Sequence, residues 1–168
     1  TADMSKKGFG ILIVAFCLIG IMATMLIVFL NEKNEDFDNE LSITVDGNKE
    51  SLMQVRDLQL VPGQSQEYKF ILVGQISGTF DITLEYLELE DGGLGPFVDV
   101  TISTDTETIH FGKLEDLLDK KDEVIFQHDF VPDEVLVIVI NYTMPLETGN
   151  EAQLTYSDFN LKLLVEKA

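Results

Sequence analysis

Hydrophobic and polar positions alternate along most of the chain from residue 41 onward, in short runs that turn residues separate. A period of two places successive side chains on opposite faces of a β-strand. The runs with this period are Leu41–Val45, Val55–Val61, Tyr68–Val73, Phe80–Glu90, Phe97–Ser103, Val124–Phe130 and Phe159–Val165. Turn residues close several of them, and Pro62-Gly63 favours a type II turn. The pattern therefore predicts a succession of short strands.

Two segments depart from simple alternation. Val135–Tyr142 is almost wholly aliphatic, which predicts a central strand buried on both faces. In the run that begins at Phe80, the apolar residues up to Tyr86 share one face, whereas Leu87 and Leu89 fall on the other. That change of face predicts a bulge, or burial on both sides, near Tyr86.

One segment has helical spacing instead. Leu114, Leu117 and Leu118 recur at intervals of three and four between charged residues, which predicts a short amphipathic helix of about two turns. Many short strands with one short helix indicate an all-β domain over residues 41–168, a β-sandwich of about eight or nine strands.

The N-terminal part of the chain has a different pattern. Residues 8–30 form an uncharged apolar segment of 23 residues, which as a helix would span about 34 Å and could cross a bilayer. Lys6 and Lys7 precede it and an acidic linker at 31–40 follows it, so residues 1–7 are expected to be cytoplasmic and the domain exported. The length of the segment favours a retained transmembrane anchor over a cleaved signal peptide, and both alternatives stay open.

Charge and cysteine content exclude several classes of function. The formal net charge is −19, from 30 acidic and 11 basic residues. A chain this acidic repels nucleic-acid phosphates, so no nucleic-acid partner is expected. Cys17 is the only cysteine and lies inside the apolar segment, so no intramolecular disulfide can form.

Three stretches resemble the TasA/camelysin family of exported biofilm-matrix fibre proteins. The first is Leu60-Val-Pro-Gly63, which leads into a strand, and the second is Gly78-Thr-Phe-Asp-Ile82. The third is Thr148-Gly-Asn150 with Gln153, followed by the closing strand. Their order and spacing cover about residues 41–166.

The resemblance implies a jelly-roll β-sandwich, export to a prokaryotic envelope and assembly into extracellular fibres. In that family an N-terminal segment of one subunit pairs with the sheet of its neighbour, a strand-addition mechanism. Here that segment would be about Asn31 to Asn39. The expected partners are therefore copies of the chain or related fibre subunits, and the membrane through residues 8–30. Its long apolar segment also fits a tethered fibre anchor, located at the cell membrane or released to the matrix.

Camelysin-type members of the family are described as metallopeptidases, so zinc ligands need to be considered. The histidines are His110 and His128, both in β-like runs, and no His-Glu-x-x-His motif occurs. They are the weak candidates for zinc ligands, and we interpret them as ordinary strand histidines; the acidic loops at 46–50 and 88–92 offer oxygen ligands for calcium but lack EF-hand spacing. No catalytic residue, cofactor, metal or small-molecule substrate is expected.

Two other functions remain as alternatives. Lys6-Lys7-Gly8-Phe9 resembles a prepilin-peptidase site before a hydrophobic helix, which would make the chain a pilin-like filament subunit. A membrane-tethered metallopeptidase of camelysin type is the second alternative. The leading prediction is a structural protein that forms or anchors fibres and is not an enzyme.

Overall fold

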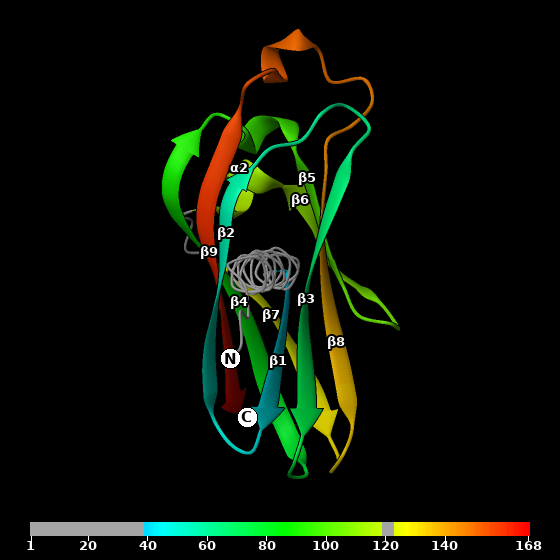
Figure 1. Cartoon of the computed structure of the whole chain (residues 1–168). Coiled ribbons are helices and arrows are strands. Elements are labelled where there is room, and N and C mark those ends of the chain that lie inside the picture. Colours follow the sequence, from blue (N-terminus) through cyan, green and yellow to red (C-terminus); the bar gives the residue numbers. More distant parts are fainter. Residues whose placement is uncertain (1–38, 119–122) are drawn as a thin grey trace, which may run out of the picture. The chain divides into compact units, whose positions relative to one another are not determined.

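The computed structural model describes residues 39–118 and 123–168 (Figure 1). The predicted membrane or signal segment at 8–30 lies outside these residues, as does the linker up to residue 38. Asp38–Ala168 forms a compact unit by itself. Within the described ranges, no helix combines the length and apolarity needed to cross a membrane.

The described part of the chain is a β-sandwich of two sheets (Figure 1). The five-stranded sheet has the order β1 (Glu40–Val45), β3 (Ser65–Gly74), β8 (Val135–Thr143), β5 (Asp99–Ser103) and β6 (Thr108–Lys113). The four-stranded sheet has the order β2 (Lys49–Leu58), β9 (Tyr156–Lys167), β4 (Gly78–Gly92) and β7 (Val124–Phe130). Short helices occur at η2 (Gly95–Phe97), α2 (Leu114–Leu117) and η3 (Asn150–Ala152). This arrangement confirms the predicted all-β sandwich.

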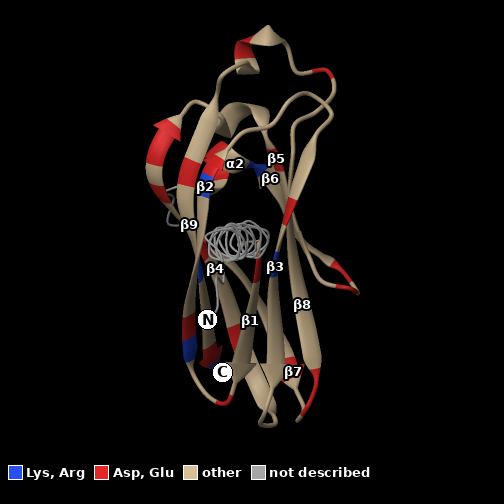
Figure 2. Ribbon diagram, viewed as in Figure 1, with Lys and Arg blue, Asp and Glu red and all other residues tan. Residues whose placement is uncertain are grey.

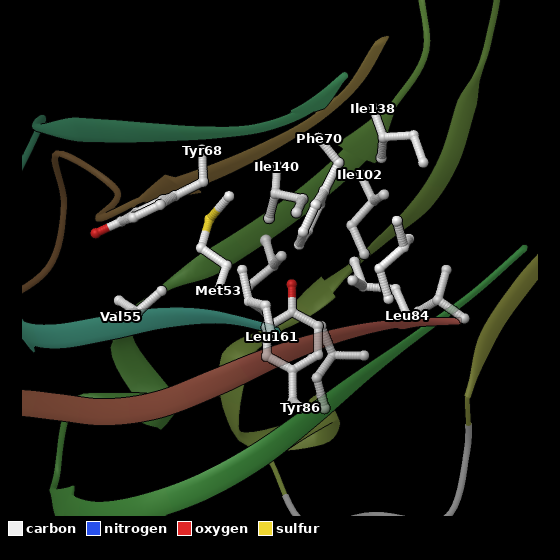
Figure 3. Packing of buried hydrophobic residues seen from close by; sticks show 14 of the residues in the cluster. Met53, Val55, Tyr68, Phe70, Leu84, Tyr86, Ile102, Ile138, Ile140 and Leu161 are labelled. Atoms are coloured by element: carbon white, nitrogen blue, oxygen red, sulfur yellow. The ribbon is translucent and has the colours of Figure 1, made fainter. Parts of the chain in front are cut away.

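Alternating burial explains why these runs become strands. Along β3 the even-numbered residues Tyr68, Phe70 and Leu72 are buried, while the residues between them are half-buried. The same alternation runs along β8 and β9, whose inner side chains meet those of the facing sheet. Side chains from both sheets form one hydrophobic cluster (Figure 3).

The prediction for the aliphatic run was right about position and wrong about burial. β8 lies between β3 and β5, so it is a central strand. Its inner residues are buried, but Val137 and Val139 on the outer face are half-buried and Val135 is 57% exposed. Among the described residues, no second layer packs on this outer face, so an aliphatic run here does not indicate burial on both sides.

Three local predictions need smaller corrections. The helix after β6 has one turn, because its C-cap Leu118 is already extended. The strand predicted from Val55 begins at Lys49, where alternation is obscured by the polar residues of an exposed edge. The irregularity expected near Tyr86 lies between Glu88 and Glu90, where the register of β4 against β9 shifts.

Two tyrosine hydroxyls form a polar contact inside the core. Tyr142 of one sheet donates a hydrogen bond of 3.2 Å to the hydroxyl of Tyr86 in the other. In Figure 3 the Tyr86 hydroxyl points across the core toward the opposite sheet. Burial raises the pKa of both hydroxyls well above the usual value, so both stay neutral at physiological pH.

Removing one of these hydroxyls should cost more stability than removing both. Tyr86→Phe leaves the Tyr142 hydroxyl buried without its acceptor, and we expect a loss of about 1–2 kcal/mol in the free energy of unfolding. Adding Tyr142→Phe removes that unpaired group, so the double variant should return to within about 0.5 kcal/mol of wild type. Urea denaturation of the three proteins measures this; additive losses in the double variant would contradict it.

The pH dependence provides an independent readout. Because the folded-state pKa values of both tyrosines are raised, their contribution is complete below the unfolded-state pKa of about 10 and is lost as the pH rises above it. Wild-type stability should therefore fall above about pH 10 more steeply than that of the double Phe variant.

Candidate functional site

Two loops meet at one end of the sandwich. One joins β2 to β3, and the other joins β8 to β9 and carries η3; they lie at the top of Figure 1. The Gly63 N–H donates to the Met144 carbonyl at 2.8 Å, and the Met144 N–H donates to the Gln64 carbonyl at 3.0 Å. These two bonds extend the pairing of β3 with β8 into the loops and hold them together.

The loop before β3 is a tight turn from Val61 to Gln64. The Gln64 N–H donates to the Val61 carbonyl at 2.9 Å, and the Val61 N–H donates to the Gln64 side-chain oxygen at 3.1 Å. Gly63 has φ +84°, the value that the third residue of a type II turn requires. The turn predicted from Pro62-Gly63 is therefore present.

The second loop is held by bonds around η3. The Gln153 side-chain amide donates to Asn150 Oδ1 at 3.1 Å, and the Thr155 hydroxyl donates to the Ala152 carbonyl at 2.7 Å. Between them Leu154 is 99% exposed and has φ +64°. A non-glycine residue in this left-handed region is strained, and here no buried contact compensates for the strain.

The two loops enclose a pocket of about 640 Å³. Its lining consists of aliphatic side chains, amides and one hydroxyl: Gln59, Leu60, Val61, Pro62, Gln64, Gly149, Asn150, Ala152, Gln153, Leu154 and Thr155. None of these side chains titrates near neutral pH, so the pocket cannot supply a general acid or base. Its amides both donate and accept hydrogen bonds, which suits binding to a neutral polar group such as a peptide backbone.

Two of the three stretches that resemble the fibre family meet at this pocket. Leu60, Val61 and Pro62 line one side, and Asn150 with Gln153 lines the other. The remaining stretch does not contribute to the pocket. It begins at Gly78, the first residue of β4, which pairs with Phe130 of β7. The sequence pattern does not show that the first and third stretches form one site, because only the β3–β8 register brings them together.

The structure places the two candidate metal ligands in different sheets. His110 is on β6, and its Nε2 is buried without a hydrogen-bond partner. His128 is on β7, where its Nε2 lies 2.9 Å from Glu134 Oε1 and its ring packs edge-on against Phe130. The described ranges contain no cluster of three or more His, Cys, Asp or Glu residues that could hold a metal ion.

Glu134 stabilises the turn between β7 and β8. A hydrogen bond from the Val131 N–H, followed by the contact with His128, holds the pKa of this carboxyl below its usual value. The carboxylate therefore closes the turn between β7 and β8, and His128 contacts a residue already engaged by the backbone.

The edge of the five-stranded sheet is a second candidate site. β1 runs parallel to β3 and pairs only with Lys69–Gly74, although β3 begins at Ser65. No described strand pairs with Ser65–Glu67 on that side. The Lys69 N–H donates outward to Asn39, so by the alternation along a strand the N–H groups of Ser65 and Glu67 also face this edge.

No family model matches the chain, and no curated protein matches it. Similar solved structures include the pre-peptidase C-terminal domain of a collagenase from Bacillus anthracis, at 10% identity and a TM-score of 0.33, covering 76% of this chain and 94% of that chain. Dimeric latent PorU from Porphyromonas gingivalis is similar at 15% identity and a TM-score of 0.33, over 74% of this chain and 13% of that chain. Likeness at this level carries no argument about function.

Replacing the strained leucine should stabilise the domain. Leu154→Gly removes the Cβ that disfavours a positive φ, and we expect the free energy of unfolding to rise by about 0.5–1 kcal/mol after the entropic cost of glycine. Leu154→Ala is the control, because it removes the same exposed side chain and keeps the Cβ. Urea denaturation compares the two; an alanine variant as stable as the glycine variant would contradict the prediction.

Proposed function

We propose that the chain is an exported cell-surface structural protein of the TasA/camelysin type, which forms or anchors extracellular fibres by strand addition. The observation that carries the proposal is the incomplete edge of the five-stranded sheet. The strand order and the composition of the segment before β1 support it further.

The strand order supports a jelly-roll. In that fold a long antiparallel ribbon wraps into two sheets, so the first strand pairs with the last and each later pair lies one step inward. Leaving β1 aside, the pairs here are β2 with β9, β3 with β8, β4 with β7 and β5 with β6. β1 is then an additional strand on the edge of the roll, and the fold already accommodates one parallel strand beside β3.

The free part of β3, by which we mean Ser65–Glu67 where no described strand pairs on the side of β1, has the properties of a receiving edge. Its backbone groups at Ser65 and Glu67 face the side on which β1 lies and extend the line of that strand. A segment paired there in the same parallel register would lie directly before Asn39, in the position of residues 36–38 of this chain. Such a segment can come from the same subunit or from a neighbour, and exchange between neighbours links subunits into a fibre.

The pocket and this edge are formed by residues that are adjacent in the sequence. Gln64 contributes to the pocket and Ser65 begins the free part of β3. A strand that passes Ser65 toward the loops would reach uncharged amide and aliphatic groups, which can bind backbone atoms without repelling an acidic segment. Residues 31–38 carry several carboxylates, so an uncharged surface favours their approach.

The first test compares two lengths of the exported part. We expect residues 31–168 to form filaments in negative-stain electron microscopy and residues 39–168 to stay unpolymerised, because only the longer chain carries the segment that adds to a neighbour. A synthetic peptide of residues 31–39 should shorten the filaments by occupying the edge. Equal polymerisation of both lengths, or filaments that ignore the peptide, would exclude this mechanism.

A proline at the receiving edge should block assembly. Glu67→Pro removes an N–H that faces the free edge and leaves the pairing of β3 with β8 intact, so we expect filament formation by residues 31–168 to stop. Glu67→Gln is the matched control, because it removes the charge and keeps the N–H. Filaments in the proline variant, with thermal melting showing a folded domain, would refute the assignment of this edge.

A further inference from the structure

The outer face of the five-stranded sheet carries an apolar surface that no described element covers. β8 contributes most of it, and β3 and β6 contribute the rest. The apolar positions of this surface, which we call the valine face, are Ile71, Val73, Phe111, Val135, Val137 and Val139. Phe111 is 70% exposed and Val135 is 57% exposed.

Cross-strand register makes this surface continuous. Val73 lies beside Val135, and Ile71 lies beside Val137. Uncharged polar residues fill the outward positions between and around them: Ser42, Thr44, Thr101, Ser103 and Asn141. In Figure 2 the ribbon of β8 is free of charged residues along its length.

Most of the charges that border the valine face are paired locally. Lys69 Nζ lies 2.9 Å from Glu67 Oε1, and Lys113 Nζ lies 2.5 Å from Asp99 Oδ1. Two of the few lysines in this acidic chain are therefore paired with carboxylates at the border of this surface. Glu40, which lies beside Lys69 on β1, adds one further carboxylate, so these five charged residues together carry a net charge of −1.

The outer face of the other sheet is different. Its outward positions carry Glu50, Arg56, Asp81, Glu85, Asp158, Lys162 and Glu166. A hydrogen bond with Glu123 and partial burial raise the pKa of Glu85, which reflects how closely the carboxyls lie on that face. The outer face of this sheet is therefore strongly acidic, whereas the outer face of the five-stranded sheet is apolar at its centre and carries mostly paired charges at its border.

We propose that the valine face is a docking surface for a second copy of this chain, packed sheet against sheet. The charge distribution selects this occupant. A basic partner would be attracted to the acidic face, whereas a partner with the same net charge can approach closely only where charge is absent. A second copy also supplies the same apolar sheet face, so the two faces can pack about a two-fold axis.

The size of the surface predicts a weak contact. Each outward position of a sheet covers about 33 Å², so the eleven positions named above give about 360 Å² per copy and about 720 Å² for the pair. This is below the range of stable specific interfaces, so a dissociation constant of about 0.1–1 mM is expected. In a fibre the contact would act many times at once and could join filaments laterally.

The contact does not depend on strand addition, so it is tested in the domain that lacks the added segment. Residues 39–168 contain every described residue of the hydrophobic core and lie within the compact unit Asp38–Ala168, so we expect this domain to fold by itself. Sedimentation equilibrium from about 10 μM to 1 mM should show a reversible monomer–dimer equilibrium. The association should strengthen with added NaCl, because salt screens the repulsion between two acidic copies.

Two matched variants locate the contact. Val135→Lys places a cation on the valine face, and Ile125→Lys places one at an equally exposed position of the other sheet, with exposures of 57% and 58%. Both lower the net negative charge by one, which by itself favours association. We expect Val135→Lys to weaken the dimer at least about tenfold, since each copy brings its cation to the contact, and Ile125→Lys to leave it unchanged or tighter.

Phe111→Lys is a second variant on the valine face and should act like Val135→Lys. A strictly monomeric domain at about 1 mM would overturn the proposal, as would equal effects of Val135→Lys and Ile125→Lys. Binding of the monomeric domain to phosphatidylcholine vesicles, abolished by Val135→Lys, would assign the face to lipid and also overturn it. If residues 31–168 with Val135→Lys still form filaments but the filaments no longer associate laterally, strand addition and the contact through the valine face are separate interactions.

Discussion

Consecutive residue pairs join β3 to β8, from Ser65 with Thr143 to Val73 with Val135, and the other features of the molecule depend on this register. At one end it continues into the bonds between Gly63, Gln64 and Met144 that hold the two pocket loops together. A shift by one residue would move every inner side chain of β3 to the outer face. The same register therefore determines the core, the pocket and the composition of the outer face.

A second constraint on this edge is the extent of β1. Within the described residues β1 spans six positions and β3 spans ten, so β1 does not reach the first residues of β3. Sheet edges with unpaired backbone groups attract further strands, and proteins that do not use them normally block them. Here the charged side chains beside Ser65–Glu67 are Glu67 and Lys69, which pair with each other, so a strand added at this edge would have to accommodate that ion pair.

Much of the fold could be predicted from the sequence because strand alternation is a local property. Val124–Phe130 was predicted with the bounds of β7, and the buried face of β4 from Phe80 to Tyr86 was predicted residue by residue. The burial of β8 could not be predicted, since a strand with apolar residues on both faces has the same sequence pattern whether or not a second layer covers its outer face. The helix after β6 was overestimated, because its leucines satisfy helical spacing while the backbone turns back into extended structure.

The candidate site was predictable only in pieces. The turn at Pro62-Gly63 and the stretch around Asn150 were identified separately, and neither carries a signal that it meets the other. Their meeting depends on pairing between strands distant in the sequence, as does the separation of His110 and His128 into different sheets. Local pattern determines the type of each element, whereas long-range register determines which residues share a surface.

The central proposal is that the edge of β3 at Ser65–Glu67 receives an added strand. Amide hydrogen exchange, followed by NMR in residues 39–168 with and without a peptide of residues 31–39, tests it most directly. The account predicts that the Ser65 and Glu67 amides exchange rapidly in the domain alone and become protected when the peptide binds. Protection that instead arises along β2, β6 or β7, with Ser65 and Glu67 unchanged, would contradict it.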